Sequence, residues 1–284
     1  MRKKHLIIYT IVSYAWSYFF WILAIFIAMN NNIEVYLNET FVESMYTGAL
    51  IGKVATVSVI ALIATFGPMI GSIVIAIIDS DFKIELLNRI FLYRKVKYYL
   101  IVIGIFLAIG FVPSIPLIFS AGITSTSPYT ILLYLITFFV IQLFTSGTEE
   151  IGWRGFMLPE FLKENDTWNA SFKTGVIWAI WHAPVVFYIF YLQDMPLFAM
   201  MFSFLGFSVG IVAMSVVHSY FLLKTKSVLF SVYLHAMSNT IPLISGLVIL
   251  DSYKTAVFAQ LLIWGVVAII IKRNPSMFPQ KQKK

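Results

Sequence analysis

Eight stretches of mainly apolar residues run through the 284-residue sequence, each about as long as a helix that crosses a membrane. They are 6–28, 54–78, 99–120, 129–148, 172–192, 197–223, 228–249 and 255–271. These runs are continuous and do not alternate in polarity every second residue, which favours helices over a barrel. Charged residues make up 12% of the chain, about half the fraction typical of soluble domains. The sequence therefore predicts an all-α fold, a polytopic membrane helical bundle of about eight transmembrane helices.

The chain shows no repeat, low-complexity tract or linker, so we expect a single membrane-embedded domain over 1–284. Residues 1–5 carry positive charge before an apolar run, as in a signal peptide. That run exceeds twenty residues and no small-residue cleavage site follows, so an uncleaved first span is expected. The absence of cysteine excludes thiolate zinc sites, a cysteine nucleophile and disulfides.

Lysines and arginines predict the orientation of the spans. If the N-terminus is cytosolic, 18 of the 20 basic residues fall in cytosolic segments, and only Lys53 and Lys254 fall outside. The sequence thus predicts a multi-pass protein of the cell membrane with both termini in the cytosol. The net charge of +7 then reflects topology and not nucleic-acid binding. Segment 82–97 mixes apolar and basic residues and is predicted to lie along the inner leaflet as an interfacial helix.

Polar and ionisable side chains inside spans are energetically costly and are therefore functional candidates. Six of them gather in the second half of the chain. They are Glu149, Glu150, Arg154, His182, His235 and Asn239. The fourth span ends just before Glu149. At 1.5 Å per residue, His182 lies ~15 Å and His235 ~11 Å from the inner end of its span, so one shared site in the cytosolic half is predicted.

Other polar residues in these spans have structural interpretations. Glu150 and Arg154 have the i,i+4 spacing of a helix ion pair, so they are expected to support the site and to orient the preceding glutamate. Trp178 is expected to serve packing. His218 lies near the inner end of the sixth span, where it is expected to reach interfacial water.

Three motifs then carry a resemblance. They read Glu149-Glu150-Ile-Gly-Trp-Arg154, Trp178-Ala-Ile-Trp-His182 and His235-Ala-Met-Ser-Asn239. In order, spacing and placement they resemble the CPBP family (CAAX protease and bacteriocin-processing, also called Abi) of intramembrane proteases, bacterial type. That family includes the CAAX prenyl endopeptidase. The resemblance covers about 130–245, the predicted protease core. Trp178 stands where the second motif often has phenylalanine, which puts only local packing or substrate fit in question.

The resemblance implies a glutamate-dependent intramembrane endopeptidase that acts on membrane-associated proteins or peptides within the lipid bilayer, by CAAX-type or peptide-maturation processing. Peptide hydrolysis needs an activated water and donors for the developing oxyanion. Glu149 can act as the general base, and His182 can hold the same water. His235 and Asn239, one turn apart, can donate N–H groups to the oxyanion.

No cofactor is favoured, and zinc is the alternative. Glu149, His182 and His235 are zinc-type donors, and catalytic zinc often has three protein ligands. However, the paired i,i+4 histidines of zincin metalloproteases are absent from the sequence. Asn239 suits an oxyanion better than zinc, and Arg154 places a cation one turn from the glutamates. These features favour a metal-free, glutamate-activated water.

Two other functions are open at this point. A proteolytically silent relative would act as a membrane scaffold or bacteriocin-immunity protein, and only the loss of function in a Glu149 variant distinguishes it from a protease. A secondary transporter with a Glu/His proton relay should have two related halves and a midplane site. The sequence has no such duplication, and its polar residues are predicted to be cytosolic.

Overall fold

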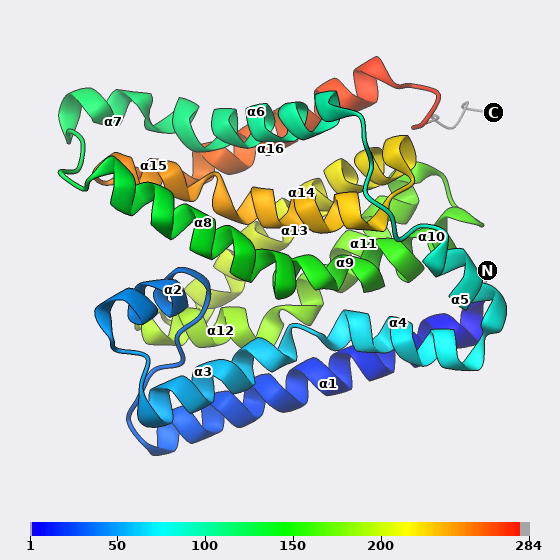
Figure 1. Ribbon diagram of the computed structural model, residues 1–284, viewed down its shortest axis with the longest axis horizontal. Coiled ribbons are helices and arrows are strands. Elements are labelled where there is room, and N and C mark those ends of the chain that lie inside the picture. The colour runs from blue at the N-terminus through cyan, green and yellow to red at the C-terminus, as the bar shows by residue number, and fades with distance from the viewer. Residues whose placement is uncertain (1, 279–284) are drawn as a thin grey trace.

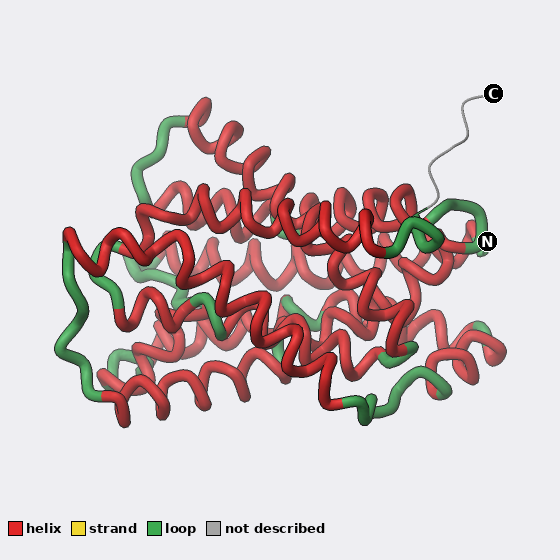
Figure 2. Tube along the Cα trace, turned by 90° about the horizontal axis from the view of Figure 1, so that it is seen from above, coloured by secondary structure: helices red, strands yellow, loops and turns green. Residues whose placement is uncertain are grey.

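The computed structural model describes residues 2–278 as a bundle of helices that run along one long axis (Figure 1). In chain order the main helices are α1 (Lys3–Asn30), α2 (Asn38–Thr47), α3 (Gly52–Ala64), α4 (Gly67–Ile78), α5 (Ser80–Leu87), α6 (Val96–Phe111), α7 (Ile115–Ser120), α8 (Pro128–Phe144), α9 (Glu149–Gly152), α10 (Leu158–Leu162), α11 (Thr167–Trp181), α12 (Ala183–Leu192), α13 (Leu197–Thr225), α14 (Val228–Thr240), α15 (Leu243–Val248) and α16 (Ala256–Arg273). Over these residues no strand forms, which confirms the all-α prediction. Seen from above, most loops lie toward the two ends of the bundle (Figure 2).

Five helical segments are long and apolar enough to cross a membrane by themselves. They are Lys3–Asn30, Val96–Ser120, Pro128–Leu162, Leu197–Thr225 and Val228–Val248. Two bent helix pairs, α3–α4 and α11–α12, bring the number to seven if each pair is one span. The eighth predicted stretch, 255–271, forms α16, which packs on α13 and α6 but does not pass the same test over the residues described. The chain is thus a multi-pass membrane protein.

The positions of α1 and α16 bear on the predicted placement of both termini on one side of the membrane. α1 begins and α16 ends at the same end of the molecule (Figure 1). This agrees with termini on one side of the membrane, while the side itself stays a prediction. Three of the basic residues that support it, Lys281, Lys283 and Lys284, lie outside the described residues.

The fourth span is longer than predicted. The prediction ended it at residue 148, whereas the helical path continues from α8 through a short 3-10 turn, α9, a π-helical turn (Trp153–Met157) and α10 to Leu162. The continuation is apolar apart from a few charges, and Arg154 is paired with Glu150, so nothing forces the helix to stop. Glu149 therefore lies inside a longer helical segment and not at its end.

The glycine at position 152 allows α9 to approach α4 and α1 closely. A Cβ at Gly152 would collide with the Pro68 carbonyl and the Tyr9 hydroxyl. On the adjacent turn, the Ser72 hydroxyl donates to the Ile151 carbonyl at 3.0 Å. This contact fixes the helix that carries the two glutamates against the first two spans.

The fifth span is bent by 50° where α11 meets α12, directly after His182. Pro184 has no N–H, so the carbonyl four residues earlier loses its helical partner. That carbonyl, of Ile180, accepts a hydrogen bond from the Tyr18 hydroxyl at 2.8 Å instead. Tyr14 makes the same kind of bond to the Ile177 carbonyl, at 2.5 Å. Two tyrosines of α1 thus stabilise the bend that presents His182.

The segment between α1 and α3 folds back against the bundle. Residues 33–37 have no regular structure, and α2 follows them and packs on α8 (Figure 1). The Tyr134 hydroxyl donates to the Glu39 carbonyl at 3.1 Å, and the Tyr46 hydroxyl lies 2.6 Å from that of Thr137. At the other end of the segment, the Val35 N–H donates to the Tyr188 hydroxyl of α12 at 3.2 Å.

The predicted interfacial helix over 82–97 is only partly correct. Helix α5 ends at Leu87, and both Phe82 and Leu86 are buried against the bundle. The residues that follow are not helical because their carbonyls bond to the start of α14. The Val228 N–H donates to the Arg89 carbonyl at 2.9 Å.

Arg2 ties the start of α1 to two other elements at the same end. Its guanidinium contacts Asp79 at 2.8 Å, Glu85 at 3.0 Å and Glu160 at 2.8 Å. The hydrogen bond from Arg2 holds the pKa of Glu85 below its ordinary value. The pKa of Asp79 is lowered first by the backbone N–H of Phe82 and then by Arg2. These contacts join α1, α5 and α10.

Candidate active site

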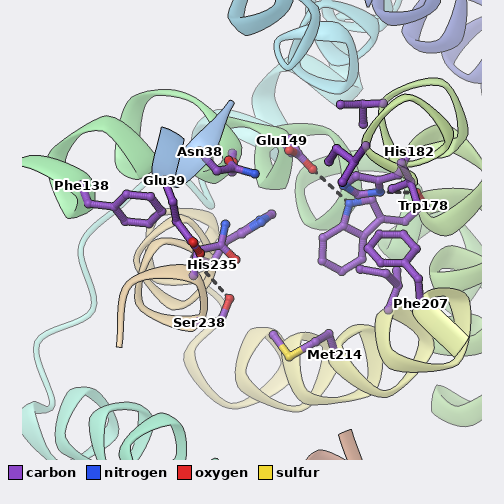
Figure 3. Close-up of a pocket in the computed structure, with 16 residues that line it drawn as sticks. Asn38, Glu39, Phe138, Glu149, Trp178, His182, Phe207, Met214, His235 and Ser238 are labelled. Atoms are coloured by element: carbon purple, nitrogen blue, oxygen red, sulfur yellow. Dashed lines mark hydrogen bonds between the residues drawn. The ribbon is translucent and has the colours of Figure 1, made fainter. Parts of the chain in front are cut away.

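Glu149 is held by two tryptophan side chains. Its Oε2 accepts a hydrogen bond from the indole N–H of Trp178 at 3.0 Å (Figure 3). It accepts another from the indole N–H of Trp153 at 3.3 Å. No hydrogen bond of the described residues engages Oε1, although the residue is only 2% exposed. The prediction that Trp178 serves packing alone is therefore incomplete, because its ring nitrogen orients the carboxylate. One carboxylate oxygen stays available to a water.

Glu150 has different partners from its neighbour. The predicted ion pair is present, with Arg154 Nη1 3.0 Å from the carboxylate and both residues fully buried. The same carboxylate accepts a hydrogen bond from His235 Nδ1 at 2.9 Å. Glu150 therefore orients His235, and no described contact joins it to Glu149 as the sequence prediction expected.

The prediction for His218 is wrong. It was expected to reach interfacial water, but the side chain is fully buried. Its Nδ1 lies 3.3 Å from Glu150 Oε2, and its ring meets those of Trp178 and His235 edge-on at 5.8 Å and 5.7 Å. Helix α13 ends close to the predicted residue, and the histidine is buried because its side of the helix packs against α11 and α14.

The two candidate histidines each use Nδ1 to fix the ring. His182 Nδ1 lies 2.9 Å from the Trp178 carbonyl, which can only accept, so this nitrogen carries the proton. His235 Nδ1 donates to Glu150 in the same way. In both residues Nε2 is the nitrogen that is left to act on a substrate or water, and in the neutral ring it is an acceptor.

Asn239 is oriented by a residue that the sequence analysis missed. Its Nδ2 donates to Gln142 Oε1 at 2.8 Å, and Gln142 Nε2 lies 3.4 Å from Asn38 Oδ1 of α2. Gln142 is 1% exposed. An amide inside the apolar run of the fourth span was a signal that could have found it, because buried amides need partners.

Four of the predicted residues meet at one cavity of about 310 Å³ between α2, α8, α9, α11, α12, α13 and α14 (Figure 3). Glu149, His182, His235 and Asn239 all line it, while Glu150 and Arg154 do not. The remaining wall is mostly apolar, from α12 and α13. The arrangement puts a carboxylate, two imidazoles and a carboxamide around a space large enough for a peptide segment.

The zinc alternative requires three side chains that can bind one metal ion. Within residues 2–278, no group of three or more His, Asp or Glu side chains is placed to hold a metal ion. Glu149 Oε2 is already engaged by two indole donors. The described donor set as it stands does not fit a three-ligand zinc site.

The sequence is similar to proteins of a known family over the segment that carries the three motifs. Residues 130–241 match the family described as type II CAAX prenyl endopeptidase Rce1-like. A protein named CAAX prenyl protease 2 from Methanococcus maripaludis is 23% identical over 272 residues, which are 88% of this chain and 97% of the relative. The chain is thus similar to the CPBP and Rce1-type CAAX proteases, and the matched segment carries all three motifs.

Proposed function

We propose that this protein is an intramembrane endopeptidase that cleaves membrane-associated proteins or peptides with a water activated by Glu149. The observation that carries the proposal is the placement of Glu149. Its Oε2 is held by Trp153 and Trp178, while the residue lines a cavity that His182 also lines. A carboxylate fixed at one oxygen presents the other in a defined direction, which is what a general base requires.

In the proposed first step, Glu149 takes a proton from a water whose position His182 Nε2 also defines as an acceptor. The oxygen attacks the scissile carbonyl and a tetrahedral oxyanion forms. Asn239 has a second N–H that is not engaged by Gln142 and can donate to this oxyanion. Glu149 then returns the proton to the departing amine nitrogen, and the C–N bond breaks.

His235 can take part as an oxyanion donor only in its doubly protonated form. Its Nδ1 proton is already given to Glu150, so Nε2 donates only when the ring is an imidazolium. The Glu150 carboxylate stabilises that positive charge, and Arg154 holds the carboxylate in place. The second glutamate of the first motif thus acts on catalysis through a histidine.

The Glu149→Gln variant tests the proposal, because it keeps the shape and removes the base. Membrane peptides from cells with the wild-type protein and with the variant are compared by mass spectrometry, and a peptide that changes is then used with purified protein. We expect cleavage to fall by about 10²–10⁴-fold. The control is Glu43→Gln, an exposed glutamate of α2 that does not line the cavity. Unchanged cleavage or phenotype in Glu149→Gln would point to a silent scaffold or immunity protein.

We further infer that this hydrolysis needs no metal ion. Purified protein should keep its activity after prolonged chelation and dialysis, because carboxylate and imidazoles suffice to activate the water. The metal content of the active preparation is measured in parallel. Stoichiometric zinc that is lost in His235→Ala, and that restores a chelated enzyme, would instead make Glu149, His182 and His235 its ligands.

A further inference from the structure

The segment before α3 forms a wall of the catalytic cavity, although it is far from the three motifs in sequence. Asn38 and Glu39 line the same cavity as Glu149 and His235. Figure 3 shows Glu39 on the side of the cavity where His235 and Ser238 lie. Two contacts fix this wall: Tyr134 binds the Glu39 carbonyl, and Gln142 lies against Asn38. The Glu39 carboxylate is therefore presented to whatever occupies the cavity.

A second cavity adjoins this wall on the side away from the start of α1. It has a volume of about 470 Å³, shares Asn38 and Glu39 with the first and extends along residues 34–40 to Gln193 at the end of α12. In the opposite direction the turn Trp153–Met157 is fully buried and closes the bundle. A peptide can thus approach Glu149 along the 34–40 segment, from the end of the bundle opposite α1's first residue (Figure 1).

Apart from the two histidines of the site, the ionisable side chains that line this path are carboxylates and tyrosines. Glu34, Glu39 and Glu149 line the two cavities, and neither cavity is lined by a lysine or arginine. Glu39 makes no ion pair with any described residue. Arg154 pairs with Glu150, and its guanidinium carbon lies 4.6 Å from the ring centroid of Trp178. A basic side chain of a substrate would meet the carboxylates of Glu34 and Glu39 along this path.

On the basis of the proposed protease function, we propose that Glu39 is a specificity-determining residue that binds a cationic side chain, lysine or arginine, of the substrate. The substrate is then a peptide segment with a basic residue near the scissile bond. Glu39 is exposed to the solvent of the cavity, so an ion pair with it is expected to affect mainly which substrates are accepted and to contribute a modest free energy.

The backbone at this position supports a fixed role for Glu39. Asn38 has φ 46°, a left-handed conformation that only a small share of non-glycine residues adopt. Asn38 is the first residue of α2, so Glu39 lies in the first turn of that helix. Through Gln142, the same turn is linked to Asn239, so the recognition residue and the oxyanion donor belong to one hydrogen-bonded chain.

Quenched-fluorescent peptides test this with purified full-length protein in lipid vesicles. One set carries a single lysine at each position around the scissile bond, and matched sets carry norleucine or glutamate there. For wild type we expect one lysine position to be preferred over norleucine by about fivefold or more in KM. Glu39→Gln should remove this preference with little change in kcat for the norleucine peptide. Glu39→Lys should favour the glutamate peptide, and Glu43→Gln on the same helix should behave as wild type.

The outcomes separate this inference from the function on which it rests. Equal KM for lysine and norleucine peptides in wild type, or an unchanged lysine preference in Glu39→Gln, overturns the role of Glu39. If Glu149→Gln still abolishes cleavage in those experiments, the protease function stands. Should Glu39→Lys not fold, the isosteric Glu39→Gln alone decides. Cleavage that survives Glu149→Gln would instead overturn the function itself.

Discussion

Glu149 and Glu150 are neighbours in sequence with opposite surroundings. Glu149 receives neutral indole donors on one oxygen, whereas Glu150 is surrounded by a guanidinium and two imidazoles. A carboxylate paired with a fixed cation is a poor base, because its negative charge is already compensated. One that has only neutral donors and a free oxygen can accept a proton from water. The two roles therefore follow from the partners of each side chain.

The burial of His218 leads to a prediction opposite to an interfacial role. His218→Ala should lower the cleavage rate and the thermal stability together, because it leaves a cavity beside Glu150 and removes a neighbour of His235. Large-to-small substitutions in a core typically cost about 2–5 kcal/mol. Rate and melting temperature are measured side by side, with His218→Gln as the more conservative change. Wild-type values of both in His218→Ala would show that the contact with Glu150 is unimportant.

The close packing of α9 on α4 predicts that a larger side chain at Gly152 lowers the stability of the protein. Gly152→Ala should destabilise the protein by about 1–3 kcal/mol, because the added methyl group meets the Pro68 carbonyl and the Tyr9 hydroxyl. It should also reduce activity, since α9 carries Glu149. Thermal unfolding in detergent measures the effect.

A matched control exists on α13. Gly206 is exposed, and a Cβ there meets no other atom within 4 Å. Gly206→Ala should leave the melting temperature unchanged or raise it slightly, since alanine favours the helix. If the two alanine variants melt alike, the close approach at Gly152 does not limit stability.

The predicted topology places both termini and the α13–α14 turn in the cytosol. Because the chain has no cysteine, a single introduced cysteine reports its side of the membrane without background. Thr225 is 2% exposed and unsuitable, whereas Lys226 is exposed in the same turn. Lys226→Cys should react with a membrane-impermeant maleimide only after permeabilisation. Labelling in intact cells would reverse the orientation of the whole bundle.

The fold class and the site residues could be read from the sequence because both depend on local patterns. Long apolar runs predict helices, and the motifs place Glu149, His182, His235 and Asn239 on helices that meet. The predictions that were wrong depended on tertiary packing. The buried position of His218 depends on which side of α13 packs against α11 and α14, and the Glu150–Arg154 pair is buried inside the helical segment that continues beyond Glu149. The approach of α2 to the cavity leaves no periodic pattern in the sequence.

The buried set of Glu150, Arg154, His218 and His235 also limits how such a sequence can change over generations. Removing one partner of a buried ion pair costs about 3–5 kcal/mol, whereas replacing all partners by apolar residues of similar volume is often neutral. A lineage that gave up proteolysis would therefore tend to lose these residues together, by coupled substitutions, and rarely one at a time.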